Sequence, residues 1–228
     1  MLPILFVGDL IVWLLTFWWD RKRKCISLYT GLCGVFYIFV NPLWRLKVIG
    51  RHKLPKDTAA IYVSNHSSLV DILVLFGLHR PFKCVSKKSN FKLPIIGLFM
   101  KLARYVELER GNRESVERMM ATCEGLLDEG VPIQIYPEGT RSPDGRLLPF
   151  KTGAFYLAKR TGAPIYPIVI RGTGEALPKK GMVLRRHIRA TVEVLDPLDP
   201  NDFATLEEMK DATRNIFEHE LASTPILP

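Results

Sequence analysis

Cysteine is scarce, and the chain lacks the patterns in which cysteine serves a structural role. Its 228 residues include four cysteines, at positions 25, 33, 84 and 123, and no two form a Cys-x-x-Cys pair. This distribution argues against a disulfide framework or a zinc site and favours reduced thiols facing the cytosol. Low-complexity segments and internal repeats are also lacking, which excludes a disordered or collagen-like protein. We expect no metal and no cofactor.

Charge is missing from most of the N-terminus. Residues 25–44 carry no charged side chain over 20 positions, and residues 2–19 carry only Asp9. A helix of 20 residues is long enough to cross a hydrocarbon layer of roughly 30 Å. The two apolar runs flank a basic cluster at residues 20–24. We expect a two-helix membrane anchor over residues 1–50 and a second, soluble domain over residues 51–228.

Three placements of these helices fit the sequence. A hairpin that spans the bilayer would put the basic cluster opposite the soluble domain, although basic clusters prefer the cytoplasmic side. Two helices embedded in one leaflet would keep the cluster and the domain on the same, cytosolic side. A hairpin packed into a soluble core is the third placement. We favour the embedded hairpin, with interfacial anchors at Trp13, Trp18, Trp19 and Trp44.

Acidic residues are absent from residues 72–106, where seven lysines and arginines lie. With a net charge of +9, the chain suits nucleic acid, anionic lipid or a phosphorylated substrate. The apolar residues between these cations are mainly aliphatic, whereas a groove for nucleic acid uses stacking aromatic side chains. We therefore expect no nucleic-acid partner, and a membrane-facing entrance for phosphate. A plain amphipathic core helix over residues 91–103 is the alternative.

Short β-rich runs alternate with helical periodicity after residue 50. One helix is predicted between Asn112 and Gly130, and another over residues 204–221. This alternation predicts an α/β domain with a mixed, largely parallel central sheet flanked by helices. Functional sites of such sheets form in the loops beyond the strand ends. The predicted strands cover residues 59–64, 82–86, 105–108, 133–136, 165–170 and 188–195.

The first candidate site follows the strand at 59–64, where His66 precedes Asp71 by five residues. Five residues turn a helix by about 140°, so the two side chains can meet only if His66 lies in the loop and Asp71 opens the next helix. A carboxylate on one imidazole nitrogen leaves the other nitrogen free to take a proton. A capping box formed by Ser68 and Asp71 is a competing interpretation. A nucleophilic Ser67 or Ser68 is another, which the absence of a Gly-x-Ser-x-Gly elbow disfavours.

The second candidate site follows the strand at 133–136, in the segment Pro-Glu-Gly-Thr-Arg-Ser at residues 137–142. Gly139 permits close approach of the backbone, Thr140 offers a hydroxyl, and Arg141 supplies a guanidinium that matches phosphate. The free amides of a helix that opens at Lys151 would also favour an anion. A surface turn with a solvated arginine is the alternative interpretation.

Four ordered blocks in residues 55–175 together resemble the bacterial lysophosphatidic acid acyltransferases, the 1-acylglycerol-3-phosphate O-acyltransferases. The blocks are residues 65–71 with the His-x4-Asp pattern, residues 88–110, residues 136–142 and residues 163–170. One departure is Tyr136, where phenylalanine is common in the family. The resemblance raises the catalytic interpretation of His66 above the alternatives.

This resemblance implies transfer of a fatty acyl group from a thioester, acyl-CoA or acyl carrier protein, to the sn-2 hydroxyl of lysophosphatidic acid. His66 would be the general base and Asp71 would support its imidazolium, at the cytoplasmic face of a bacterial inner membrane. The alternatives are another lysolipid acceptor, such as a lyso-ornithine lipid, or a non-catalytic lipid-binding protein. The residues implied to position the phosphate end are Lys88, Arg110, Glu138, Gly139, Thr140 and Arg141.

Overall fold

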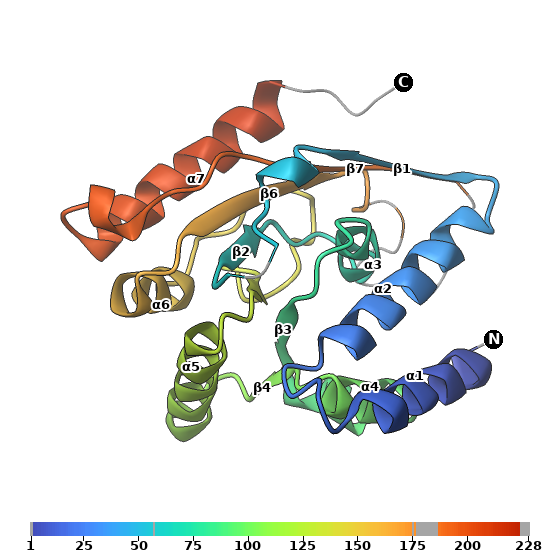
Figure 1. Cartoon of the computed structure of the whole chain (residues 1–228). Helices are drawn as coiled ribbons and strands as arrows, with labels where there is room; N and C mark the ends of the chain where they lie inside the picture. Colours follow the sequence, from blue (N-terminus) through green and yellow to red (C-terminus); the bar gives the residue numbers. More distant parts are fainter. Residues whose placement is uncertain (1, 57, 175, 177–186, 224–228) are drawn as a thin grey trace.

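A seven-stranded sheet forms the centre of the protein (Figure 1), in the order β1-β7-β6-β2-β5-β3-β4. The computed structural model describes residues 2–56, 58–174, 176 and 187–223. Parallel pairing joins every neighbouring pair of strands except β6 and β7, which are antiparallel. The predicted mixed, largely parallel sheet is thus confirmed. The strands are β1 Trp44–Ile49, β2 Ile61–Ser64, β3 Lys83–Lys87, β4 Val106–Leu108, β5 Ile133–Ile135, β6 Ile165–Arg171 and β7 Ile188–Val194.

All six predicted strands are present, and β1 is a seventh that the sequence analysis missed. Its residues alternate between buried or half-buried apolar side chains and exposed Arg45 and Lys47, as expected for an edge strand. The strand pattern was missed because Trp44, its first residue, also ends the uncharged run at residues 25–44. We therefore assigned Trp44 to the N-terminal unit. Since β1 pairs with β7, the sheet begins before the expected domain boundary at residue 50.

Helices cover both faces of the sheet (Figure 1). Along β2, Tyr62 belongs to one buried cluster, whereas Ile61 and Val63 belong to the other. This alternation follows from the pleat of a strand that is covered on both faces. One face carries α2 Lys24–Phe39 and α3 Asp71–Phe76, and the other carries α5 Arg113–Asp128, α6 Gly153–Thr161 and α7 Leu206–Ser223.

The N-terminal segment forms two helices, α1 Leu2–Thr16 and α2, that pack against each other. Asp9, the charge within the first apolar run, is buried and accepts a hydrogen bond from Thr30 Oγ1 at 2.6 Å. Asp20 begins α2 by accepting from the backbone amides of Lys24 and Cys25 at 2.9 and 2.7 Å. No helix in the described part of the chain combines the length and apolar character needed to cross a bilayer.

The turn between α1 and α2 is bound to the sheet domain by two cations. Buried Lys83 donates from Nζ to the Arg23 carbonyl at 3.0 Å and to Ser27 Oγ at 2.8 Å. Arg104 donates to the Arg21 carbonyl at 2.9 Å and pairs with Glu129. Burial lowers the pKa of Lys83 to about 7. Two of the seven cations expected at a phosphate entrance therefore hold the hairpin instead.

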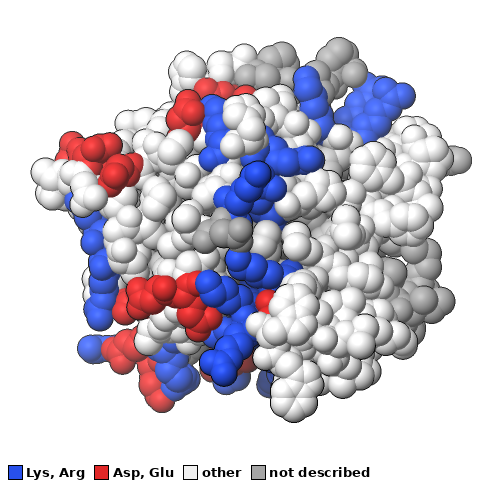
Figure 2. Space-filling view, in the orientation of Figure 1, with Lys and Arg blue, Asp and Glu red and all other residues white. Residues whose placement is uncertain are grey.

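An exposed apolar surface, here called the hairpin face, covers the outside of α1 and α2. Trp18 is 80% exposed and Leu15 is 72% exposed, values that are unusual for such large apolar side chains when they cluster. Figure 2 shows this region as almost free of charge, with a band of lysines and arginines beside it. The hairpin face comprises Val7, Ile11, Leu14, Leu15, Trp18, Trp19, Leu32, Phe36 and Phe39.

Candidate active site

The predicted site residues follow four neighbouring parallel strands, β2, β5, β3 and β4. His66 comes after β2, Glu138 after β5, Lys88 after β3 and Arg110 after β4. Because the carboxyl ends of parallel strands meet at one edge of a sheet, these residues share what we call the catalytic edge. Strands lie about 4.8 Å apart, so the strand before Arg110 is roughly 14 Å from the strand before His66.

His66 and Asp71 are in direct contact, because His66 lies in the loop and Asp71 opens α3, the one arrangement in which the sequence allowed them to meet. The imidazole Nδ1 lies 2.7 Å from Asp71 Oδ2, with Asp71 fully buried and the His66 side chain 17% exposed. The same carboxylate oxygen accepts from the backbone amides of Ser67 and Ser68 at 2.8 and 2.9 Å. Asp71 therefore holds the backbone of the loop before α3 and orients His66 at the same time. With Asp71 ionised, Nδ1 carries the ring proton, and Nε2 is left as a proton acceptor.

The two interpretations that competed for this segment have different outcomes. The capping contact exists, because Asp71 does reach back to the Ser68 amide. It accompanies the histidine contact and does not replace it. A nucleophilic Ser68 conflicts with its burial, since its side chain is inaccessible to a substrate.

Tyr136 contacts His66 directly, although the sequence analysis noted it only as a departure from the family pattern. Its ring stacks on the His66 imidazole with centroids 3.9 Å apart and planes 19° from parallel. The Tyr136 hydroxyl is buried and has no hydrogen-bond partner among the described residues, and burial raises the pKa of this phenol. The ring, and not the hydroxyl, is therefore the part of Tyr136 that contacts the base. Its aromatic character, directly before Pro137, was the only signal in the sequence.

Glu138 joins the two loops of the site. Its Oε1 accepts from the His66 amide at 2.8 Å and its Oε2 accepts from the Leu148 amide at 2.9 Å. In return, the Ser142 amide donates to the His66 carbonyl at 2.8 Å. Burial raises the pKa of Glu138. Its two oxygens bind backbone amides of both loops and so fix the loop that carries His66.

The remaining predicted residues lie along the catalytic edge. Gly139 has a φ of +67°, a conformation that favours glycine, and the end of the Lys151 side chain lies beside it. Thr140 and Arg141 continue the same loop. Lys88 pairs with Glu109 at 2.8 Å.

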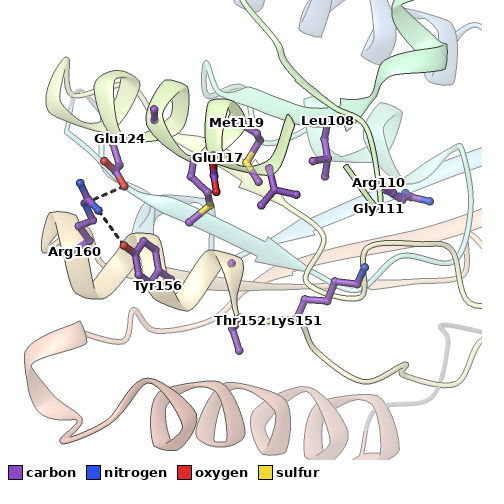
Figure 3. Close-up of a pocket in the computed structure, with 14 residues that line it drawn as sticks. Leu108, Arg110, Gly111, Glu117, Met119, Glu124, Lys151, Thr152, Tyr156 and Arg160 are labelled. Carbon is purple, nitrogen blue, oxygen red and sulfur yellow. Dashed lines mark hydrogen bonds and ion pairs between the residues drawn. The ribbon is translucent and has the colours of Figure 1, made fainter. Parts of the chain in front are cut away.

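Arg110 lies at the far end of this edge. It lines a groove of about 710 Å³ between α5 and α6 (Figure 3). The edge thus offers a base at one end and cations along its length. Among the described residues, no three His, Cys, Asp or Glu side chains gather in a way that would hold a metal ion.

A partly exposed imidazole held by a buried carboxylate is suited to act as a general base on a hydroxyl group. The protein belongs to the Acyltransferase family, whose model matches residues 45–171. This span includes His66, Asp71 and the loop at 137–142.

Three similar proteins carry the name 1-acyl-sn-glycerol-3-phosphate acyltransferase. A Chlamydomonas reinhardtii protein is 41% identical over 186 residues, which cover 77% of this chain and 55% of that protein. A chloroplastic Arabidopsis thaliana protein is 39% identical over 71% of this chain and 46% of its own length. A Haemophilus influenzae protein is 33% identical over 79% of this chain and 75% of its own length. The chain thus spans about half the length of the algal and plant relatives.

One solved structure shares the fold over nearly the whole chain. The crystal structure of the 1-acyl-sn-glycerophosphate acyltransferase PlsC from Thermotoga maritima matches with a TM-score of 0.72. The match covers 98% of this chain and 96% of that chain at 26% sequence identity. The N-terminal helices are therefore part of the shared architecture.

Proposed function

We propose that the protein transfers an acyl group from a thioester to the sn-2 hydroxyl of 1-acyl-sn-glycerol-3-phosphate, forming phosphatidic acid. The observation that carries the proposal is the contact of 2.7 Å between His66 Nδ1 and Asp71 Oδ2, placed on the edge that also holds Arg141. The names of the similar proteins support this acceptor.

In the proposed reaction, Nε2 of His66 takes the proton of the acceptor's sn-2 hydroxyl while the hydroxyl oxygen attacks the thioester carbonyl carbon. The C–O bond forms, the C–S bond breaks, and the imidazolium returns the proton to the departing thiolate. Proton transfer of this kind contributes about 10² to 10⁴ in rate. Asp71 stabilises the imidazolium from the ring edge, and Tyr136 fixes the ring plane. The thioester is already activated, so no other group is needed to expel the thiol.

The cations of the catalytic edge are proposed to hold the acceptor's phosphate. The backbone on both sides of Arg141 is held beside His66, by Glu138 and by the Ser142 amide, so Arg141 belongs to the loop next to the base. Lys88, Arg110, Gly139 and Thr140 complete the set predicted from the sequence. A guanidinium suits phosphate because its N–H groups match two phosphate oxygens at once.

The hairpin face is proposed to hold this edge at the cytoplasmic surface of a bacterial inner membrane. β1 pairs parallel with β7, which is antiparallel to β6, so β1 starts at the catalytic edge. Helix α2 ends at Phe39, shortly before β1. The exposed Phe39 at the end of α2 and His66 therefore lie toward the same edge, where a lipid acceptor can enter from the bilayer.

A purified enzyme tests this function with one labelled acyl thioester and a panel of acceptors in mixed vesicles. We expect phosphatidic acid from lysophosphatidic acid, and loss of transfer in His66→Ala with the fold retained by circular dichroism. Preference for a phosphate-free lysolipid would contradict the acceptor. Near-normal turnover of His66→Ala would contradict the catalytic assignment.

A further inference from the structure

A small pocket lies between α2 and the end of α3, toward the edge of the sheet opposite the catalytic edge. Helix α3 begins at Asp71 and rises by roughly 9 Å over its six residues, and β3 then starts from the opposite edge at Lys83. Helices α2 and α3 pack side by side here (Figure 1). The pocket has a volume of about 160 Å³, below the range of about 300 to 1,000 Å³ typical of sites for whole small molecules. It therefore suits one small group at the end of a larger ligand.

One wall of the pocket carries positive charge without a counterion. Half-buried Arg80 lines it, and its Nε is buried without a hydrogen-bond partner among the described residues. His79 lines the same wall, and burial together with the nearby charges of Arg51 and Arg80 lowers the pKa of its imidazole. Residues 72–106 contain no acid, and neither Arg80 nor His79 pairs with a carboxylate within the described part of the chain. Because a partly desolvated guanidinium without a counterion is unfavourable, this wall favours an anion.

The hydrogen bonds around the pocket leave most donors of this wall unused. The Ser27 hydroxyl, which also lines the pocket, donates to the Arg23 carbonyl and accepts from Lys83 Nζ, both at 2.8 Å. Nη1 of Arg80 makes one long contact of 3.4 Å with the carbonyl of the preceding residue. A guanidinium has five N–H donors, so Arg80 retains several for a ligand. Its planar arrangement of donors matches two oxygens of a phosphate at once.

The other wall is apolar and continues onto the hairpin face. Leu28 and Leu32 line the pocket from α2, and both side chains are exposed. Phe36 follows Leu32 by four residues and is also exposed, so the three side chains form one stripe along the helix. The stripe extends by roughly 12 Å from Leu28 to Phe36, and its last two members belong to the hairpin face. An acyl chain attached to a group in the pocket therefore has a continuous apolar path on the proposed membrane surface.

We propose that this pocket binds the phosphate of an anionic phospholipid that is not a substrate of the enzyme. The phosphate lies against Arg80 and His79, and one acyl chain lies along the stripe from Leu28 to Phe36. A zwitterionic head group fits less well, because its ammonium group would lie close to the positive charges of Arg51 and Arg80. The bound lipid joins α2 to the end of α3. The site is remote from the catalytic edge, so the inference depends on the membrane contact of the hairpin face and not on acyl transfer.

Native mass spectrometry of the full-length protein tests this site by counting the lipids that remain bound after the detergent is removed. From neutral micelles that contain phosphatidylglycerol, the wild type should retain one lipid, and from micelles with phosphatidylcholine it should retain none. Arg80→Gln should weaken the binding of phosphatidylglycerol about tenfold, as expected for loss of one charge-assisted contact. Arg21→Gln is the matched control, because Arg21 is exposed in the hairpin turn and lies outside the pocket. Equal loss of lipid in the two variants would indicate attraction by the general positive charge and would overturn the site.

Inorganic phosphate distinguishes a lipid from a free anion as the ligand. In NMR titrations, the imidazole signals of His79 should shift at phosphatidylglycerol concentrations at least about tenfold below those needed with inorganic phosphate, because the free ion lacks the acyl chain. Equal affinities would overturn the lipid assignment.

The stability of Arg80→Gln separates a ligand-binding arginine from a structural one. In neutral detergent without anionic lipid, the variant should unfold at a urea concentration no lower than the wild type, because it removes a charge that no carboxylate of the described residues compensates. A lower midpoint would identify Arg80 as a structural residue and overturn its assignment. Failure to acylate lysophosphatidic acid would refute the proposed function alone, because none of these measurements needs turnover. Failure to retain phosphatidylglycerol would refute this site alone.

Discussion

Replacing Asp71 by asparagine separates the charge of this residue from its hydrogen bonds. One oxygen, Oδ2, accepts all three contacts, from the His66 ring and from the Ser67 and Ser68 amides. The other, Oδ1, is buried without a hydrogen-bond partner. In Asp71→Asn the amide oxygen therefore takes the position of Oδ2, and the ring keeps its tautomer. The negative charge is lost, and the new amide NH2 lies at the buried Oδ1 position without an acceptor, which should cost about 1–3 kcal/mol of stability.

The loss can be estimated from Coulomb's law. At an effective dielectric constant of about 20, two unit charges 4 Å apart attract each other by about 4 kcal/mol. In the proposed reaction the imidazolium forms as the proton is transferred, so this energy is lost from the transition state and not from substrate binding. We expect kcat to fall by about 10³, since each 1.36 kcal/mol is worth a factor of ten. KM for both substrates should change little.

The assay is release of free thiol from acyl-CoA in the presence of lysophosphatidic acid vesicles, together with urea unfolding of each variant. Asp71→Ala is the informative comparison, because it leaves the Ser67 and Ser68 amides without an acceptor and should cost about 1–3 kcal/mol of stability for each. If Asp71→Asn kept kcat within threefold of the wild type, the carboxylate would not stabilise charge on His66, and the reasoning would be wrong.

Three further predictions concern other parts of the molecule. Tyr136→Phe should keep kcat within twofold because it retains the stacked ring, whereas Tyr136→Leu should lower kcat about tenfold and alter the imidazole signals of His66 in NMR spectra. Since the pKa of buried Lys83 is lowered to about 7, the unfolded chain binds more protons between pH 7 and 10, and stability should rise with pH by up to about 1.4 kcal/mol per pH unit. Urea unfolding should show a flatter profile in Lys83→Met; parallel profiles would contradict this. The double variant Leu15→Asp, Phe39→Asp should reduce cosedimentation with vesicles about tenfold. Unchanged cosedimentation would show that the hairpin face does not bind the membrane.

Much of the fold was predictable because its signals are local. The six strands after residue 50 are short apolar runs between turn residues, and each was found. β1 escaped because its pairing partner, β7, lies more than 140 residues away along the chain, and because Trp44 ends a long uncharged run. A strand at the sheet edge has too little apolar character to stand out beside such a run.

The contact between His66 and Asp71 could be anticipated for a different reason. His66 and Asp71 are five residues apart, so a loop followed by a helix start is sufficient to bring them together. The roles of Tyr136 and Glu138 depend on contacts across about seventy residues, which no local pattern encodes. Lys83 shows the same limit, since its charge suggested a surface role, whereas its side chain is buried against the hairpin turn.

The clamp formed by Lys83 and Arg104 has a mechanical consequence. Both side chains donate hydrogen bonds to carbonyl oxygens of the turn between α1 and α2. These bonds restrict rotation of the hairpin relative to the sheet. On a lipid surface, the protein would move as one rigid body, and the hairpin would set how deeply it inserts. The distance from His66 to the hydrocarbon layer would then be fixed. Only lipids whose hydroxyl group lies at that depth could reach the imidazole.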